Sequence, residues 1–304
     1  MDKEILPKRN QTGQRKRDSR AKGIPEVMQH RFRWTDVLAQ IGLIVWAVIC
    51  LFPVYWMFTF SLKTNNEIFG ENVMGLPREW VWSNYTRALN VGHMGQYFLN
   101  SIIVTVVTIA ITLIAAVMAT YAITRLHWKG RKRMNKFFML GLTIPIHAAI
   151  VPLYTTFSRI GMLNTRWALI ISYSAFSLSM AILIATGFMG DIPYDLDEAA
   201  FLDGCGVWGI FFRVIAPLMM PAVSTVGIYT FLQSWNELMF ATVFISKEAY
   251  KTLPVGIQSL SGQYTTEWGP IGAALALATL PTLIAYLFLS RQIQDSFIAG
   301  AVKG

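Results

Sequence analysis

An acidic segment closed by a glycine lies between two apolar stretches of the chain. Asp197 and Glu198 follow Pro193 closely, and Gly204 comes just beyond them. Proline suits the first turn of a helix, the helix dipole favours acidic side chains there, and glycine is a common helix stop. The pattern predicts a helix over 193–203, about 16 Å long. Its carboxylates can accept charge-assisted hydrogen bonds from a basic partner.

One side of this expected helix combines small, apolar and acidic residues at helical spacing, namely Leu196, Ala199, Ala200 and Asp203. Small alanines let another backbone come close. After the glycine, a second amphipathic helix leads to Pro217. A compact helical knob of this kind is suited to touching another surface, and the alternative is a plain amphipathic surface helix.

Polar residues interrupt the apolar run 218–245. Helical spacing places them on one stripe with Phe240 and nearly opposite Trp235: Tyr229, Gln233, Asn236 and Glu237. If this run crosses a membrane, the carboxylate must face protein or water, because a charge at mid-membrane costs ~2.5–3.5 kcal/mol. An aromatic ring beside amide and carboxylate groups suits a site that grips sugar hydroxyls. The same groups could hydrogen-bond between helices or latch a gate, and both interpretations stay open.

His147 lies between Pro145 and Pro152, on a helix face shared with Thr143 and Tyr154. The prolines free backbone carbonyls and bend a helix, so we expect a neutral imidazole to fill the gap rather than to relay protons or contact a substrate. No spacing of histidines and cysteines suits a metal. The motifs G-x-x-x-x-G-K, G-x-S-x-G and H-E-x-x-H are missing, so we expect no catalytic residue, no enzyme activity and no cofactor of the chain's own.

The composition is that of a membrane protein. Of 304 residues, 54% are hydrophobic and 14% charged, and the mean hydropathy is +0.45. Six runs approach the ~20 apolar residues that span a bilayer, and their backbones must be helical in lipid. The runs are Val37–Phe60, Ser101–Ile123, Phe137–Phe157, Ala168–Met189, Leu218–Ile245 and Ile271–Leu289. We therefore predict an all-α protein with six transmembrane helices, divided into a tail (1–36), a membrane domain (37–290) and a C-terminal tail (291–304).

Lysine and arginine concentrate before Val37 and in the connection 125–136. The positive-inside rule places both regions in the cytoplasm. Six spans then place the segment 191–217 and the C-terminus there too. Orientation and contact with anionic lipid account for the net charge of +9, so we expect no nucleic-acid partner.

The acidic segment resembles the cytoplasmic coupling signature of ATP-binding-cassette (ABC) importer permeases, which reads E-A-A, three residues, G, nine residues, I-x-L-P. The matching residues are Glu198, Ala199, Ala200, Gly204 and Pro217. Val214 replaces the isoleucine of that pattern, and Ala216 replaces the leucine. Three further runs resemble carbohydrate-uptake permeases of the maltose/maltodextrin type: Asn84–Val104 with its Asn100–Ser101 pair, Phe231–Ala241, and Gly300–Gly304.

The resemblance implies a permease subunit in a bacterial cell membrane, with a coupling helix between its fourth and fifth spans. It would import a carbohydrate by alternating access, together with a second related permease, two cytoplasmic ATPases that bind the ATP, and an external sugar-binding protein. We further expect the outer loop Thr252–Trp268 to insert toward that binding protein, and its candidate residues are Gly256, Gln258, Gln263 and Tyr264. The alternative for this segment is a simple capping loop. The alternative is an ion-coupled secondary transporter that uses Glu237 and His147, although no inverted repeat is evident.

Overall fold

The computed structural model describes residues 34–70, 72–90, 93–260 and 266–301, with side chains up to residue 287. Every regular element in these ranges is a helix and none is a strand, which agrees with the predicted all-α class. The chain separates into two compact units, residues 1–52 and 53–304. Helix α1 (Trp34–Ser61) begins in the first unit. The predicted basic tail 1–36 lies almost wholly outside the described residues.

Four helices are long and apolar enough to cross a membrane. They are α1, α4 (Met94–Thr124), α7 (Arg166–Gly190) and the first part of α14 (Trp268–Ala301). Two further helix pairs qualify only when each pair is taken together, so the described residues hold four candidate spans, or six if each bent pair is one span. Because α14 continues through Ala301, most of the predicted tail 291–304 is helical, and residues 302–304 lie outside the described residues.

The third predicted span, Phe137–Phe157, is not one helix. Its elements are α5 (Arg131–Leu140), the 3-10 turns η1 (Gly141–Thr143) and η2 (Ile146–Ala149), and α6 (Ile150–Arg159). The two halves meet at 96°. Pro145 is the cause, since proline has no N–H to continue a helix and forces the preceding residue out of helical geometry; Ile144 is extended, with ψ of 115°. The sequence predicted a bend there, but the break is complete.

The fifth predicted span, Leu218–Ile245, is also interrupted. Helix α11 (Met220–Trp235) stops well before the end of the run, and α12 (Met239–Phe244) follows after a break. Before α11 come α9 (Val207–Ile210), the π-helical turn η3 (Phe211–Ile215) and α10 (Ala216–Leu218). This preceding stretch meets α11 at 71°, with Pro217 and Pro221 on either side of the bend.

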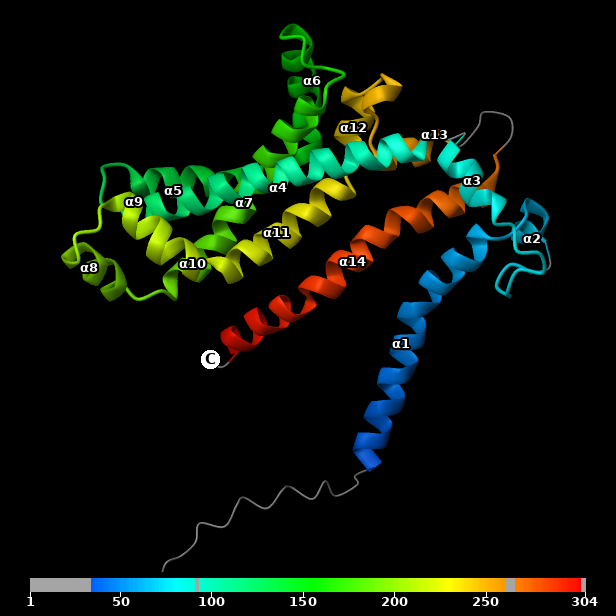
Figure 1. Ribbon diagram of the computed structural model, residues 1–304, viewed down its shortest axis with the longest axis horizontal. Coiled ribbons are helices and arrows are strands. Elements are labelled where there is room, and N and C mark those ends of the chain that lie inside the picture. Colours follow the sequence, from blue (N-terminus) through cyan, green and yellow to red (C-terminus); the bar gives the residue numbers. More distant parts are fainter. Residues whose placement is uncertain (1–33, 71, 91–92, 261–265, 302–304) are drawn as a thin grey trace, which may run out of the picture. The chain divides into compact units, whose positions relative to one another are not determined.

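Helices α4, α7 and α11 pack together as the centre of the second unit (Figure 1). Their contact face is rich in small buried side chains, among them Ala116, Ala181 and Thr112, which let the backbones approach closely, as in other membrane bundles. At one end of α4 lie α3 (Ser83–Asn90) and α13 (Leu253–Ser259). At its other end lie α8 (Asp195–Leu202) and α9. Helix α4 therefore connects two separate clusters of short helices.

Candidate functional site

Helix α8 forms the expected acidic knob, but it begins two residues later than predicted. The backbone N–H groups of Asp197 and Glu198 both bond the carbonyl of Tyr194, so the first turn starts there and Pro193 precedes it. Gly204 ends the helix as predicted, in the left-handed region with φ of +83°. The N–H of Gly204 bonds the carbonyl of Phe201, and the next N–H bonds that of Ala200, which is the Schellman stop.

The predicted contact face of α8 is partly buried and partly exposed. Ala200 is buried in an apolar cluster with Ile210 and Ile215, so it attaches the helix to the rest of the chain. Leu196, Ala199 and Asp203 are exposed instead. Glu198 is exposed too, as are two large apolar side chains outside the predicted face, Phe201 (71%) and Leu202 (85%). The outward side of α8 therefore combines free carboxylate with apolar surface.

Arg125, which sequence analysis used only as a marker of orientation, anchors α8. Its Nη1 lies 2.9 Å from Oδ2 of Asp197, and the two side chains are only 4% and 13% exposed. Its Nη2 donates to the carbonyls of Met189, at 2.9 Å, and Ile192, at the end of α7. No local signal pairs Arg125 with Asp197, because the partners lie 72 positions apart in the chain.

Tyr194 and Tyr121 complete this anchor. The guanidinium carbon of Arg125 lies 4.4 Å from the ring centroid of Tyr194, a cation–π geometry. The Tyr194 hydroxyl donates back to the carbonyl of Thr124 at 2.9 Å. The Tyr121 hydroxyl donates to the carbonyl of Val207 at the start of α9. The ends of α4 and α7 and the starts of α8 and α9 are thus joined by polar contacts.

The predicted polar stripe is split by the break after α11. Tyr229, Gln233 and Glu237 line one cavity of about 270 Å³, together with Phe240 and Tyr173. The carboxylate of Glu237 accepts hydrogen bonds from the Tyr173 hydroxyl (2.5 Å) and from the backbone N–H groups of Phe240 (2.8 Å) and Ala241 (3.2 Å). It therefore caps the N-terminus of α12 as an N-cap side chain does.

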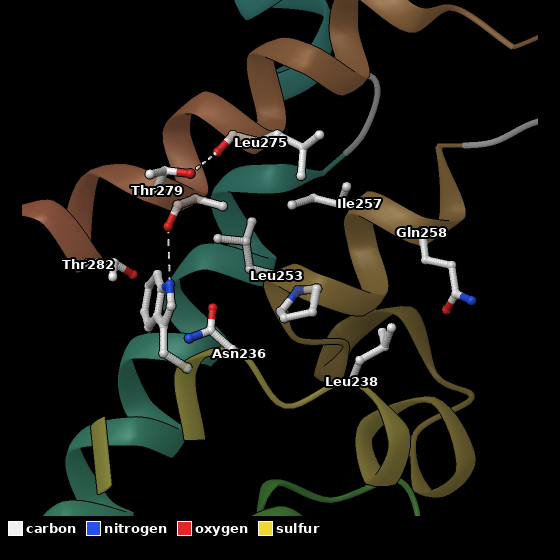
Figure 2. A pocket seen from close by; sticks show the side chains of 11 residues that line it. Asn236, Leu238, Leu253, Ile257, Gln258, Leu275, Thr279 and Thr282 are labelled. Atoms are coloured by element: carbon white, nitrogen blue, oxygen red, sulfur yellow. Dashed lines mark hydrogen bonds between the residues drawn. The ribbon is translucent and has the colours of Figure 1, made fainter. Parts of the chain in front are cut away.

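Asn236 points into a different cavity, of about 480 Å³, with Gln258 on its far side (Figure 2). Its side-chain amide donates to the carbonyl of Leu232 and closes the C-terminus of α11. Trp235 is buried, stacks on Phe231, and donates its indole N–H to the carbonyl of Ala278, so it packs against α14. Figure 2 shows that this cavity is lined from the end of α11, from α13 and from α14.

Two other predicted groups lie elsewhere. His147 is exposed on η2, so within the described part of the chain its imidazole does not fill a gap in a bent helix. Gly256 is not a loop turn but a buried residue of α13, where an added Cβ would overlap the ring of Tyr97. Gln258 is exposed at the end of that helix, whereas Gln263 and Tyr264 lie outside the described residues.

The Asn100–Ser101 pair, noted in the sequence only for its resemblance, forms a second anchor at the opposite end of α4. Asn100 accepts from the Nε and Nη2 of Arg166, at 3.0 and 2.8 Å, and donates to the carbonyls of Ala249 and Lys251, at 3.0 and 2.9 Å. The hydroxyl of Ser101 accepts from the N–H of Leu253 at 2.8 Å. These bonds hold the segment between α12 and α13 against α4.

Known proteins are similar in sequence to this chain over most of its length. The family described as "binding-protein-dependent transport system inner membrane component" matches residues 111–298. The diacetylchitobiose uptake system permease protein NgcG of Streptomyces coelicolor is 32% identical over 86% of this chain and 87% of its own length. The trehalose/maltose transport system permease protein MalG of Thermococcus litoralis is 32% identical over 88% of this chain and 97% of its own.

A solved structure shares the fold. It is the crystal structure of a bacterial ABC transporter involved in the import of the acidic polysaccharide alginate, with a TM-score of 0.76 and 20% identity, covering 86% of this chain and 98% of the matched one. The family match, the two relatives and the helical architecture agree. The chain belongs to the family of inner membrane components of binding-protein-dependent transport systems, and is a multi-pass ABC transporter permease.

Proposed function

We propose that the chain is the permease subunit of a bacterial importer that carries a carbohydrate, most simply an oligosaccharide, across the inner membrane. The names of its relatives, which state uptake of diacetylchitobiose and of trehalose and maltose, support this substrate class. In the proposed assembly the chain pairs with a second, related permease. Two cytoplasmic ATPases bind and hydrolyse the ATP, and an external binding protein delivers the sugar.

The outward surface of α8 is the observation that supports coupling to an ATPase most directly. Phe201 and Leu202 are largely exposed beside the carboxylate of Glu198, on a helix whose other side is anchored by Ala200. Adjacent exposed apolar side chains with polar groups at their rim mark a protein contact site. ATP-driven closure of the two ATPases would displace α8, and the attached helices would then rock around the translocation path.

The basic residues support the proposed orientation. The hollow formed by residues 128–133 contains Lys129, Arg131, Lys132 and Arg133. It lies at the start of α5, at the same end of the bundle as α8 (Figure 1). By the positive-inside rule this end is cytoplasmic, which would place α8 and the C-terminus where ATP is available.

The two cavities near the end of α11 are the proposed sugar contacts. Tyr229 and Gln233 bond only weakly to each other, at 3.3 Å, so both can turn toward hydroxyl groups. Asn236 and Gln258 offer amides in the second cavity. Glu237 accepts three hydrogen bonds from within the chain, so its carboxylate holds the start of α12. The family match gives no support to the ion-coupled alternative.

Coupling is tested in the complete complex with Glu198→Ala and Gly204→Val. Loss of a charge-assisted hydrogen bond costs about 1.5–3 kcal/mol, and a Cβ in left-handed geometry costs roughly 1 kcal/mol or more. Both variants should insert normally, retain less ATPase on purification and lose uptake. Normal ATPase retention with normal uptake in both would contradict the proposal.

The substrate class is tested by ATP hydrolysis of the reconstituted complex with its binding protein and a panel of sugars. A stimulating oligosaccharide would identify the class. If no carbohydrate stimulates hydrolysis while another type of solute does, the carbohydrate assignment is wrong.

The path is tested by cysteines placed at positions 229, 233 and 235 in a background without Cys50 and Cys205. Positions 229 and 233 should react with a small water-soluble thiol reagent, and to an extent that changes when ATP is added. Position 235 is buried against α14 and should not react. Reaction at 235 alone would place the path elsewhere.

A further inference from the structure

We infer that Arg125 is the positioning residue that makes α8 move as one body with the ends of α4 and α7, so that displacement of α8 reaches the spans through this side chain. The inference rests on the proposed function, since it concerns how the proposed coupling helix is attached. It assigns a role to a residue that neither the coupling signature nor the polar stripe contains.

The geometry brings three elements to one guanidinium. Arg125 directly follows the last residue of α4, and its Nη1 holds Asp197 in the first turn of α8. Its Nη2 holds the carbonyls of Met189 and Ile192. The last carbonyls of a helix have no partner within the helix, so Arg125 caps α7 while it binds α8. A guanidinium holds its donors in a fixed planar fork, so its bonds to several acceptors define their relative positions, whereas the donors of an ammonium group rotate.

Burial separates this contact from an ordinary surface ion pair. The side chains of Arg125 and Asp197 are 4% and 13% exposed, whereas those of Arg87 and Glu267, the other arginine pair among the described residues, are 51% and 52% exposed. An exposed ion pair contributes little to stability and does not fix the positions of its two side chains, because water competes for both partners. Separating the two members of a buried ion pair would leave an unpaired charge inside the protein. The paired geometry is therefore strongly favoured. The Tyr194 ring over the guanidinium adds to this shielding.

Apolar packing alone does not attach α8 firmly. A hollow of about 500 Å³ lies beside the anchor, lined by Tyr121, Leu126, Phe201 and Val207 as well as by the ion pair itself. Only the small Ala200 side chain of α8 is buried in the adjoining apolar cluster. The polar contacts of Arg125 therefore bridge a place where side-chain packing is incomplete.

The test uses the complete complex in liposomes and compares Arg125→Ala, Arg125→Lys and the matched control Asp195→Asn, which changes an exposed acid of the same turn. Three quantities are measured: ATPase retained on purification, sugar transported per ATP hydrolysed, and hydrogen exchange of the backbone amides of 195–203. Arg125→Ala should lower the sugar transported per ATP at least about tenfold. The free energy lost when one member of a buried ion pair is removed corresponds to a larger factor than ten. The same variant should also speed exchange in α8. Arg125→Lys should fall between, and Asp195→Asn should match the unmodified complex.

Unchanged transport per ATP and unchanged exchange in Arg125→Ala would overturn the inference. So would an Arg125→Lys variant equal to the unmodified complex, because a charge alone would then suffice. If the unmodified complex shows no sugar-stimulated hydrolysis, the proposed function fails, and hydrogen exchange then decides the inference by itself: faster exchange in α8 of Arg125→Ala supports the anchor, and equal exchange refutes it.

Discussion

The two ends of α4 are anchored by different chemistry. At one end Arg125 binds a carboxylate, Asp197, and thereby holds α8. At the other end the neutral amide of Asn100 binds Arg166 and two backbone carbonyls, and thereby holds the segment before α13. The two anchors are separated by about 37 Å of helix at 1.5 Å per residue. One continuous helix therefore links the proposed ATPase contact to the segment proposed to face the binding protein.

The contacts of the two anchors indicate which end of α4 can move. Asn100 bonds the main chain of residues 249 and 251, so the position of that segment is fixed independently of its side chains, and Ser101 adds a further backbone contact. Arg125 also bonds two main-chain carbonyls at the end of α7, but it holds α8 only through the side chain of Asp197, beside a hollow. We expect the Asn100 end to behave as a rigid clamp. We expect the Arg125 end to be the place where displacement of α8 by the ATPases is passed to α4.

The largest effect is expected from Asp197→Leu. The guanidinium of Arg125 would stay buried without its carboxylate, which costs about 3–5 kcal/mol of unfolding free energy. Thermal unfolding of the purified chain in detergent measures this, with Asp195→Leu as the exposed control. Adding Arg125→Met should recover much of the loss, because an apolar pair replaces a buried ion pair at little cost. Equal unfolding temperatures for the two single variants would show that burial does not strengthen the pair.

A smaller effect is expected from Asn100→Ala at the other end. It removes the acceptor of Arg166 and the donor to the carbonyl of Lys251, whereas the carbonyl of Ala249 keeps its bond from Gln96. An unsatisfied buried group costs about 1–3 kcal/mol. The same unfolding measurement applies, with the exposed Asn66→Ala as control. If Asn100→Ala destabilises more than Asp197→Leu, the neutral clamp is the stronger anchor and the comparison must be reversed.

Gly256→Ala tests how tightly the Asn100 end is packed. The new Cβ would overlap the ring of Tyr97, whose hydroxyl bonds Glu248, and overpacking of this kind costs about 1–3 kcal/mol. Gly95→Ala is the matched control, since a Cβ there meets nothing within 4 Å. Gly95→Ala should be neutral or slightly stabilising. Indistinguishable stabilities would mean that α13 yields easily, against the idea of a rigid clamp.

The smallest effect is a pH dependence at the same end. Hydrogen bonds from Lys251 and Tyr97 hold the pKa of Glu248 below its ordinary value. A lowered pKa stabilises the folded state above the ordinary glutamate pKa, and this contribution is lost as pH falls through the folded-state pKa. Because the Glu248 side chain is 61% exposed, the effect should be slight. Protease sensitivity of 246–252 should rise at acidic pH in the unmodified chain, whereas Glu248→Gln should show no such rise.

Local features of this fold could be predicted from sequence, and contacts between distant elements could not. The acidic start and the glycine stop of α8 are properties of adjacent residues, so the helix and the left-handed Gly204 were predicted. Arg125 and Asp197 meet only because α4 and α8 come together in space. Charge patterns alone cannot identify such a pair.

The broken helices show a second limit. The stripe over Tyr229 to Glu237 was predicted by continuing one helical period through the run, but Asn236 closes α11 and Glu237 opens α12. The side chains of both residues satisfy backbone groups at these helix ends, and consecutive polar residues in an apolar run were the signal present in the sequence. The break was missed because apolar residues continue on both sides of it, so the run still has the hydrophobicity of one membrane span. At Pro145 the signal was recognised, and its effect was underestimated.

The central claim is that the α8 end of α4 meets the ATPase and the opposite end does not, and site-specific cross-linking tests it most directly. Single cysteines replace Leu202, which is 85% exposed on α8, and Ala249, which is exposed near Asn100, in the complete complex without Cys50 and Cys205. A thiol–amine cross-linker should join position 202 to the ATPase and stop sugar-stimulated hydrolysis, while position 249 should never reach the ATPase. Cross-linking of 249 to the ATPase, or failure of 202 in every nucleotide state, would contradict the account.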